Sequence, residues 1–178
     1  MQILSYILSF LGFLSFVCTT LIKGEKMKQI LFLVFCCNFF YATSYLVAGS
    51  GINGAASCYL GALLAIINYF FDSRNKPIPK WLMALYALSF IAVNIAVGGL
   101  SYLVLIAIVA TLIFVISIGQ KNGAGFRFWT IFNLALWCLY DVLSASYGAL
   151  VAHVVQMLFT VIGMLVHDRK KENKTVSA

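Results

Sequence analysis

The sequence contains few charged residues and almost no proline. Only 10% of its 178 residues are charged, five of them acidic, and its two prolines are Pro77 and Pro79. A soluble domain carries about 25% charged and about 45–50% apolar residues. This chain is instead 63% hydrophobic, with a mean hydropathy of +1.00. These absences exclude a soluble domain and indicate an integral membrane protein.

The sequence also lacks the motifs of the common enzyme classes. It has no nucleophile elbow, no HExxH, no phosphate loop and no pair of catalytic carboxylates, and only two histidines. We therefore expect no catalytic residue, no metal and no cofactor. The net charge of +7 would suggest a nucleic-acid partner in a soluble protein. Here the basic residues lie in loops between apolar segments, so the expected partner is the lipid bilayer.

Polar residues divide the chain into apolar segments of the length that spans a membrane, about 20 residues. We predict an all-α protein with seven transmembrane helices, over 4–22, 29–48, 53–71, 81–97, 100–118, 128–146 and 147–166. The first segment has no basic region before it and no small-residue cleavage site, so we expect a helix and not a signal peptide. All five cysteines lie within these segments, and no disulfide is expected.

The basic residues have a one-sided distribution along the chain. All 12 follow the first, third, fifth or seventh segment: Lys23, Lys26 and Lys28; Arg74, Lys76 and Lys80; Lys121 and Arg127; Arg169, Lys170, Lys171 and Lys174. Cytoplasmic loops carry an excess of Lys and Arg. The pattern predicts a cytoplasmic C-terminus and an N-terminus outside.

The sequence shows a weak internal repeat at an offset of 95 positions. The offset brings Asn38 onto Asn133 and Tyr45 onto Tyr140; the other matches are Gly24 with Gly119, Lys26 with Lys121 and Arg74 with Arg169. We predict two parallel triple-helix repeats, 1–74 and 99–169, joined by a linker and fourth helix over 75–98 and followed by a basic tail, 170–178. Such repeats place a solute path between them near the midplane.

This 3+1+3 plan, the outside N-terminus and a Trp and polar pair on the last two helices resemble the SWEET and PQ-loop transporter superfamily, which includes the PnuC vitamin transporters. The segments "INGAASCYLGALLAIINYFFDSR" and "SYGALVAHVVQMLFTVIGMLVHDRK" look most like the YgjV-type bacterial inner-membrane proteins. The resemblance implies alternating-access transport in a bacterial inner membrane. The PQ dipeptide is absent and both prolines lie in the linker, which argues against a proline-hinged rocking motion.

Asp141 is the only charged residue well inside a predicted helix, where ionisable side chains typically face a cavity or a partner. Asp141 and His153 lie six residues before and after the hairpin centre at Tyr147, so they share one depth. We predict that they approach each other, as candidates for proton coupling. Alternatively, Asp141 reaches the outer surface and His153 bonds a backbone carbonyl.

Trp137 lies one helical turn before Asp141, and Asn133 lies one turn earlier on the same face. The spacing fits either one wall of a solute site or a packed helix whose amide bonds a neighbour. The resemblance favours the site, because SWEET-type sites use a Trp on the sixth helix and an Asn on the seventh, places similar to those of Trp137 and His153. His153 in place of Asn weakens the case for a sugar.

The first repeat has Ala42 and Cys58 opposite Trp137 and His153, so the site should be asymmetric. The remaining candidates are Asn38, to complete the site, Gln156, and Tyr45 and Tyr140, which either close its outer side or anchor the interface. The predicted function is transport of a small polar or aromatic-polar solute such as a sugar, vitamin or nucleoside. The alternative is a non-transporting membrane protein that binds a partner or lipid; a homo-oligomer is left open. A cavity at the level of Trp137 would favour transport, and a packed centre the alternative.

Overall fold

The computed structural model describes residues 2–23, 26–49, 52–144 and 147–168, and within these ranges it is all-helical. Its seven helices are α1 (Gln2–Leu21), α2 (Met27–Ala48), α3 (Ile52–Ser73), α4 (Lys80–Gly98), α5 (Tyr102–Ile118), α6 (Gly123–Leu143) and α7 (Tyr147–His167). The predicted all-α class and helix count are confirmed. Gly24, Arg169, Lys170, Lys171, Lys174 and the predicted tail 170–178 lie outside the described ranges.

Five of the helices, α1 to α4 and α7, are long and apolar enough to cross a membrane. The 17 residues of α5 make it a shorter apolar helix. Helix α6 has 21 residues but is not among the five, because Arg127, Asn133 and Asp141 interrupt its apolar sequence. The least apolar of the long helices therefore carries most of the candidate site.

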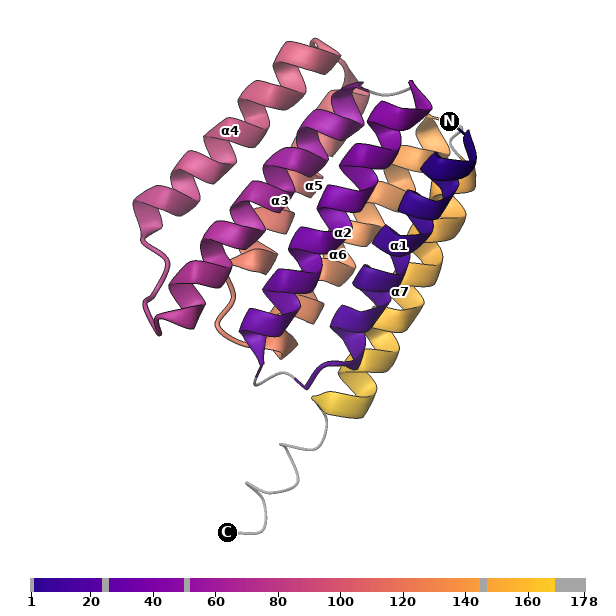
Figure 1. Ribbon diagram of the computed structural model, residues 1–178. Coiled ribbons are helices and arrows are strands. Elements are labelled where there is room, and N and C mark those ends of the chain that lie inside the picture. The colour runs from indigo at the N-terminus through magenta and orange to yellow at the C-terminus, as the bar shows by residue number, and fades with distance from the viewer. Residues whose placement is uncertain (1, 24–25, 50–51, 145–146, 169–178) are drawn as a thin grey trace, which may run out of the picture.

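Each helix packs against its neighbours in sequence, and α1 packs against α7, so the chain forms a closed bundle. In the view of Figure 1, α1 to α4 lie in front and α5 to α7 behind. Glycines allow close approach where α1 meets its neighbours. A Cβ on Gly12 would lie 3.3 Å from the Cys37 carbonyl oxygen of α2, and one on Gly163 of α7 would lie 2.8 Å from the Thr20 carbonyl oxygen.

The hydrophobic core is concentrated at one end of the bundle. Its buried members come from the first turns of α2, α4 and α6 and the later turns of α3 and α5: Met27, Ile30, Leu31, Val34, Leu64, Ala65, Leu82, Tyr86, Phe90, Val115, Ile118 and Phe126. Asn68 of α3 fixes this end by donating to the Ile118 carbonyl at 3.0 Å and accepting from the Tyr86 hydroxyl at 3.1 Å.

The same end carries the basic residues. The described Lys and Arg side chains all belong to the connections or terminal turns at this end: Lys23, Lys26, Lys28, Arg74, Lys76, Lys80, Lys121 and Arg127. We call it the basic end. The candidate site residues on α6 and α7 lie toward the opposite end, away from the hydrophobic core.

One predicted helix, the sixth, is wrong by more than two residues at each end. The sixth helix was expected over 128–146, but α6 begins at Gly123 and ends at Leu143. Asn122 starts it early, because its side-chain oxygen accepts a hydrogen bond from the Gly125 backbone N–H at 2.8 Å. Arg127, expected in a loop, therefore lies inside the first turns of the helix and is buried.

Candidate functional site

Asp141 of α6 and His153 of α7 form a contact across the helical hairpin. The His153 Nδ1 atom lies 2.6 Å from Asp141 Oδ2. The Asp141 side chain is 4% exposed and that of His153 is 25% exposed. The predicted approach of the two residues is confirmed, because the hairpin places them at one depth. With an ionised Asp141, the short contact requires a proton on Nδ1.

The imidazole keeps one nitrogen for another partner. No hydrogen bond within the described residues involves the His153 Nε2 atom. This atom accepts a hydrogen bond when the ring is neutral and donates one when the ring is charged. The pair can therefore bind a polar group of either kind at Nε2, and its binding preference depends on the proton that it carries.

One aromatic side chain of α6 packs on the imidazole, and a second packs on the first. The Trp137 ring stacks on His153, with ring centroids 6.0 Å apart and planes 24° apart. Tyr140 meets Trp137 edge-on at 5.4 Å. Trp137, Tyr140, Asp141 and His153 thus form one group, which we call the α6–α7 cluster. All are half-buried except Asp141, which is buried.

Tyr45 approaches the α6–α7 cluster from α2. Its hydroxyl interacts electrostatically with Cys58 of α3 first, and then with Asp141 and Tyr140 of the cluster. Its ring covers Gly54 of α3, where a Cβ would come within 3.0 Å of the ring. Tyr45 also lines a depression of about 350 Å³ together with Gln2, Ser5, Tyr6, Ser9, Ser44 and Ala48. Whether Tyr45 closes the outer side of the site stays a prediction.

The two candidate asparagines are engaged in helix packing. The Asn133 amide donates to the Ala110 carbonyl of α5 at 2.7 Å and is buried. The Asn38 amide donates to the Val34 carbonyl of its own helix at 2.9 Å, and its oxygen faces Gly61 of α3. The bond of Asn133 is the interhelical one that the packing alternative expected. Neither amide bonds a member of the α6–α7 cluster.

Gln156 connects α7 to the other layer of the bundle. Its side-chain amide donates to the Tyr41 hydroxyl of α2 at 3.0 Å. The residue is buried one turn beyond His153. Tyr41 was not among the predicted site residues, although its spacing of three from Asn38 and four from Tyr45 places it on the same face of α2 and could have identified it.

A second contact between α6 and the end of α7, a salt bridge, was also not predicted from the sequence. Arg127 donates from Nη2 to Asp168 Oδ1 at 2.6 Å and from Nε to Oδ2 at 3.1 Å. It also donates to the Ile22 carbonyl at the end of α1, at 3.1 Å. The Arg127 side chain is 0% exposed and that of Asp168 is 18% exposed. This contact fixes three helices at the basic end.

The described residues offer no metal site, and two depressions on their surface lie away from Trp137 and His153. No group of three or more His, Cys, Asp and Glu side chains among them is placed to hold a metal ion. One depression is the α1–α2 hollow at Tyr45, and the other lies between α2 and α3 at the basic end. Neither is lined by Trp137 or His153.

A family model described as a bacterial inner membrane protein, Imp-YgjV, matches residues 1–171 of the chain. No curated protein and no solved structure matches the chain.

Proposed function

Because the chain belongs to the Imp-YgjV family of bacterial inner membrane proteins, we propose that it transports a small polar or aromatic-polar solute across that membrane. The observation that carries the proposal is the Asp141–His153 contact, together with the stacking of the His153 ring on Trp137. The protein contributes binding and movement and no catalytic step.

The cost of burying Asp141 supports a functional role. A charged side chain in a membrane helix costs about 2.5–3.5 kcal/mol at the bilayer centre on insertion scales. This is an upper limit for Asp141, which lies two residues before the end of α6. A packing contact between α6 and α7 needs no charge, since apolar side chains of the same size would fill the space. A carboxylate and an imidazole, with Nε2 open, are suited instead to bind a polar group or to move a proton.

The aromatic residues supply what a mostly apolar pocket needs for a flat solute. The Trp137 ring offers an apolar face, and its indole N–H has no hydrogen-bond partner within the described chain. His153 and Tyr45 add polar atoms at the edge. Sites of this kind combine apolar walls with a few placed polar groups. We infer a solute with a flat ring and a polar edge, such as a vitamin or nucleoside.

The helix boundaries support two parallel repeats. A shift of 95 positions carries α2 (Met27–Ala48) onto 122–143, where α6 spans Gly123–Leu143, and α3 (Ile52–Ser73) onto 147–168, where α7 spans Tyr147–His167. Helix α4 packs on both α3 and α5, as a linker would. We propose the division 1–74, 75–98, 99–169 and 170–178, with alternating access between the two triplets as in the SWEET and PQ-loop superfamily.

The gathering of Lys and Arg at one end supports an orientation with that end in the cytoplasm. The N-terminus is then outside. Cysteines introduced beside Gly51 and Ser146 should react with an impermeant thiol reagent added to intact cells, and those in the Lys23 to Lys28 connection should not. The reverse labelling would invert the proposed orientation.

The experiment that tests transport has two stages. A thermal-shift screen of metabolites on the purified protein identifies a solute, because a ligand at 100 times its dissociation constant stabilises the folded state by about 2.7 kcal/mol. Uptake of that solute into liposomes is then compared between the parent, Trp137→Ala and Trp129→Ala. Trp129 is the matched control, since it lies on the same helix and contacts Phe128 and Phe132 outside the α6–α7 cluster.

Trp137→Ala should weaken solute binding about 5- to 150-fold, or about 1–3 kcal/mol, because it removes both the apolar ring face and the indole N–H offered to the solute. Trp129→Ala should behave like the parent. Equal uptake by all three proteins would remove the α6–α7 cluster from the transport path.

A second candidate is a non-transporting membrane protein on the same fold. Two surface depressions favour it, because they lie on the α1–α2 and α2–α3 faces of the bundle, where a lipid or a partner can reach them. A protein of this kind would bind lipid or a partner without moving a solute. Liposomes that take up no solute identified by the screen would support this candidate.

A further inference from the structure

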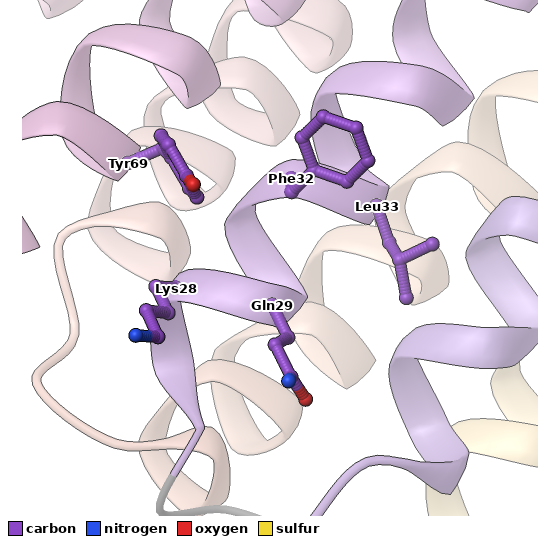
Figure 2. Close-up of a pocket in the computed structure, with 5 residues that line it drawn as sticks. All are labelled: Lys28, Gln29, Phe32, Leu33 and Tyr69. Atoms are coloured by element: carbon purple, nitrogen blue, oxygen red, sulfur yellow. The ribbon is translucent and has the colours of Figure 1, made fainter. Parts of the chain in front are cut away.

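A surface depression of about 420 Å³ lies between α2 and α3 at the basic end. It is lined by Lys28, Gln29, Phe32, Leu33 and Tyr69 (Figure 2). These residues are remote from the α6–α7 cluster, since the first four lie in the first two turns of α2 and Tyr69 lies near the end of α3. The proposed transport leaves this depression without a role.

The depression has a polar end and an apolar end. Lys28 and Gln29 are exposed in the first turn of α2, and Figure 2 shows them below the side chains of Phe32 and Leu33. One helical turn, about 5.4 Å, separates Lys28 from Phe32. Polarity therefore changes along α2 in the order in which a lipid changes from head group to acyl chain.

The apolar part is open to the surface and is partly aromatic. Phe32 is 47% exposed, and its ring lies 6.1 Å from that of Tyr69 across the depression. The Tyr69 hydroxyl has no hydrogen-bond partner within the described chain. An aromatic ring with a free hydroxyl suits the boundary between head groups and acyl chains.

Positive charge dominates the polar part. The salt bridges of the described chain are Arg127–Asp168 and His153–Asp141, so no described carboxylate pairs with Lys28. Glu25, in the connection before α2, lies outside the described residues. Lys23 and Lys26 precede it in the same connection, and Arg74 and Lys76 follow α3. Asp72, three residues after Tyr69, is the one described carboxylate in this part of α3.

We propose that this depression binds one anionic phospholipid from the leaflet at the basic end. The Lys28 ammonium contacts the phosphate, Gln29 and Tyr69 bond head-group oxygens, and the acyl chain follows Phe32 and Leu33. Each lysine near an anionic surface adds an attraction that depends on salt. The lipid is the fitting source of the phosphate, because free phosphate leaves the apolar half of the depression uncovered.

The test compares thermal stability of the full-length protein in detergent with added phosphatidylglycerol, phosphatidylcholine or glycerophosphate. Phosphatidylglycerol should raise the apparent melting temperature of the parent, and the other two should raise it less. Lys28→Gln should weaken the phosphatidylglycerol effect about fivefold in lipid concentration, the change that one lysine gives at an anionic surface. Phe32→Ala should also weaken the stabilisation by phosphatidylglycerol. Only in Lys28→Gln should that stabilisation depend less on salt than it does in the parent.

Lys121→Gln is the matched control, because Lys121 is an exposed lysine at the same end and does not line the depression. It should respond like the parent. An equal loss in Lys121→Gln, a full response in Lys28→Gln, equal stabilisation by phosphatidylcholine, or self-association that blocks the lipid response would each overturn the proposal. None of these results bears on solute transport, since Lys28→Gln leaves the α6–α7 cluster intact.

Discussion

Arg127 and Asp168 join α6 to α7 at the basic end of the bundle, and Asp141 and His153 join the same two helices toward the other end. The first contact consists of two hydrogen bonds between the side chains and a third to the Ile22 carbonyl of α1. The second is one short contact. Beside it, Trp137 stacks on an imidazole that keeps an unbonded nitrogen.

The difference lies in what each contact can still do. Arginine does not lose its proton in proteins, and all the donors that Arg127 uses are directed at fixed acceptors. Histidine changes charge around neutrality, and His153 has a nitrogen to offer a solute. One pair of helices is therefore held rigidly at the basic end, while its other end is able to respond to a proton or a ligand.

The largest expected effect is on stability, from breaking the basic-end contact. Asp168→Asn should lower the free energy of unfolding by about 3 kcal/mol, the lower limit for breaking a buried ion pair, because Asp168 is partly exposed and Asn keeps an acceptor. The measurement is unfolding in mixed detergent micelles. Asp72→Asn is the control, since Asp72 forms no salt bridge within the described chain. A loss below about 1 kcal/mol would mean that the contact does not fix the helices.

The reason why this contact was not predicted from the sequence is its range. Arg127 and Asp168 are 41 residues apart, and no local pattern relates them. A charged residue without a visible partner is best placed in a loop, which moved the predicted start of the sixth helix from Gly123 to 128. The other helices were predicted within about two residues, because their apolar runs end at charges, Gly or Pro.

The Asp141–His153 contact could be predicted because a tight hairpin relates the depth of residues on its two helices. The partner of Asn133 could not. Whether its amide faces the solute site or α5 depends on the rotation of α6 about its axis. That rotation is set by contacts with α5, where Asn133 bonds Ala110 and Thr130 bonds Ser117. Spacing along one helix carries no information about that rotation.

The same substitution in the second contact should have a smaller effect on stability and a larger effect on function. Asp141→Asn should cost about 1 kcal/mol, because a hydrogen bond to a charged group contributes about 1.5–3 kcal/mol and a neutral one about 0.5–1.5. Uptake by the parent should change between about pH 5 and 8, the range of imidazole titration, and Asp141→Asn should abolish that change. Unfolding in mixed detergent micelles measures the stability cost. Liposome uptake at several pH values measures the pH response of the parent and of Asp141→Asn.

The other titratable groups near Asp141 are Tyr140 and Cys138 of α6 and Tyr45 of α2, with Cys58 of α3 close to Tyr45. Tyr and Cys side chains ordinarily titrate above neutrality, so they do not supply a response in this range. Asp168→Asn should leave the pH response of uptake unchanged. A response that is flat in the parent, or that survives Asp141→Asn, would leave both contacts with a structural role only.

The smallest expected effect on stability is that of a change at Asn133, which lies on α6 between the two contacts. This change tests whether Asn133 serves packing or solute binding. Asn133→Ala removes the bond to the Ala110 carbonyl and should cost about 0.6 kcal/mol of stability, the average for polar contacts between membrane helices. Asn94→Ala should cost less, because that amide bonds only the Phe90 carbonyl of its own helix. Solute affinity should stay within about twofold of the parent, since the amide of Asn133 is committed to α5 and a change of that size is about 0.4 kcal/mol. An affinity loss as large as that of Trp137→Ala would place Asn133 in the site and extend the responsive part of α6 one turn closer to Arg127.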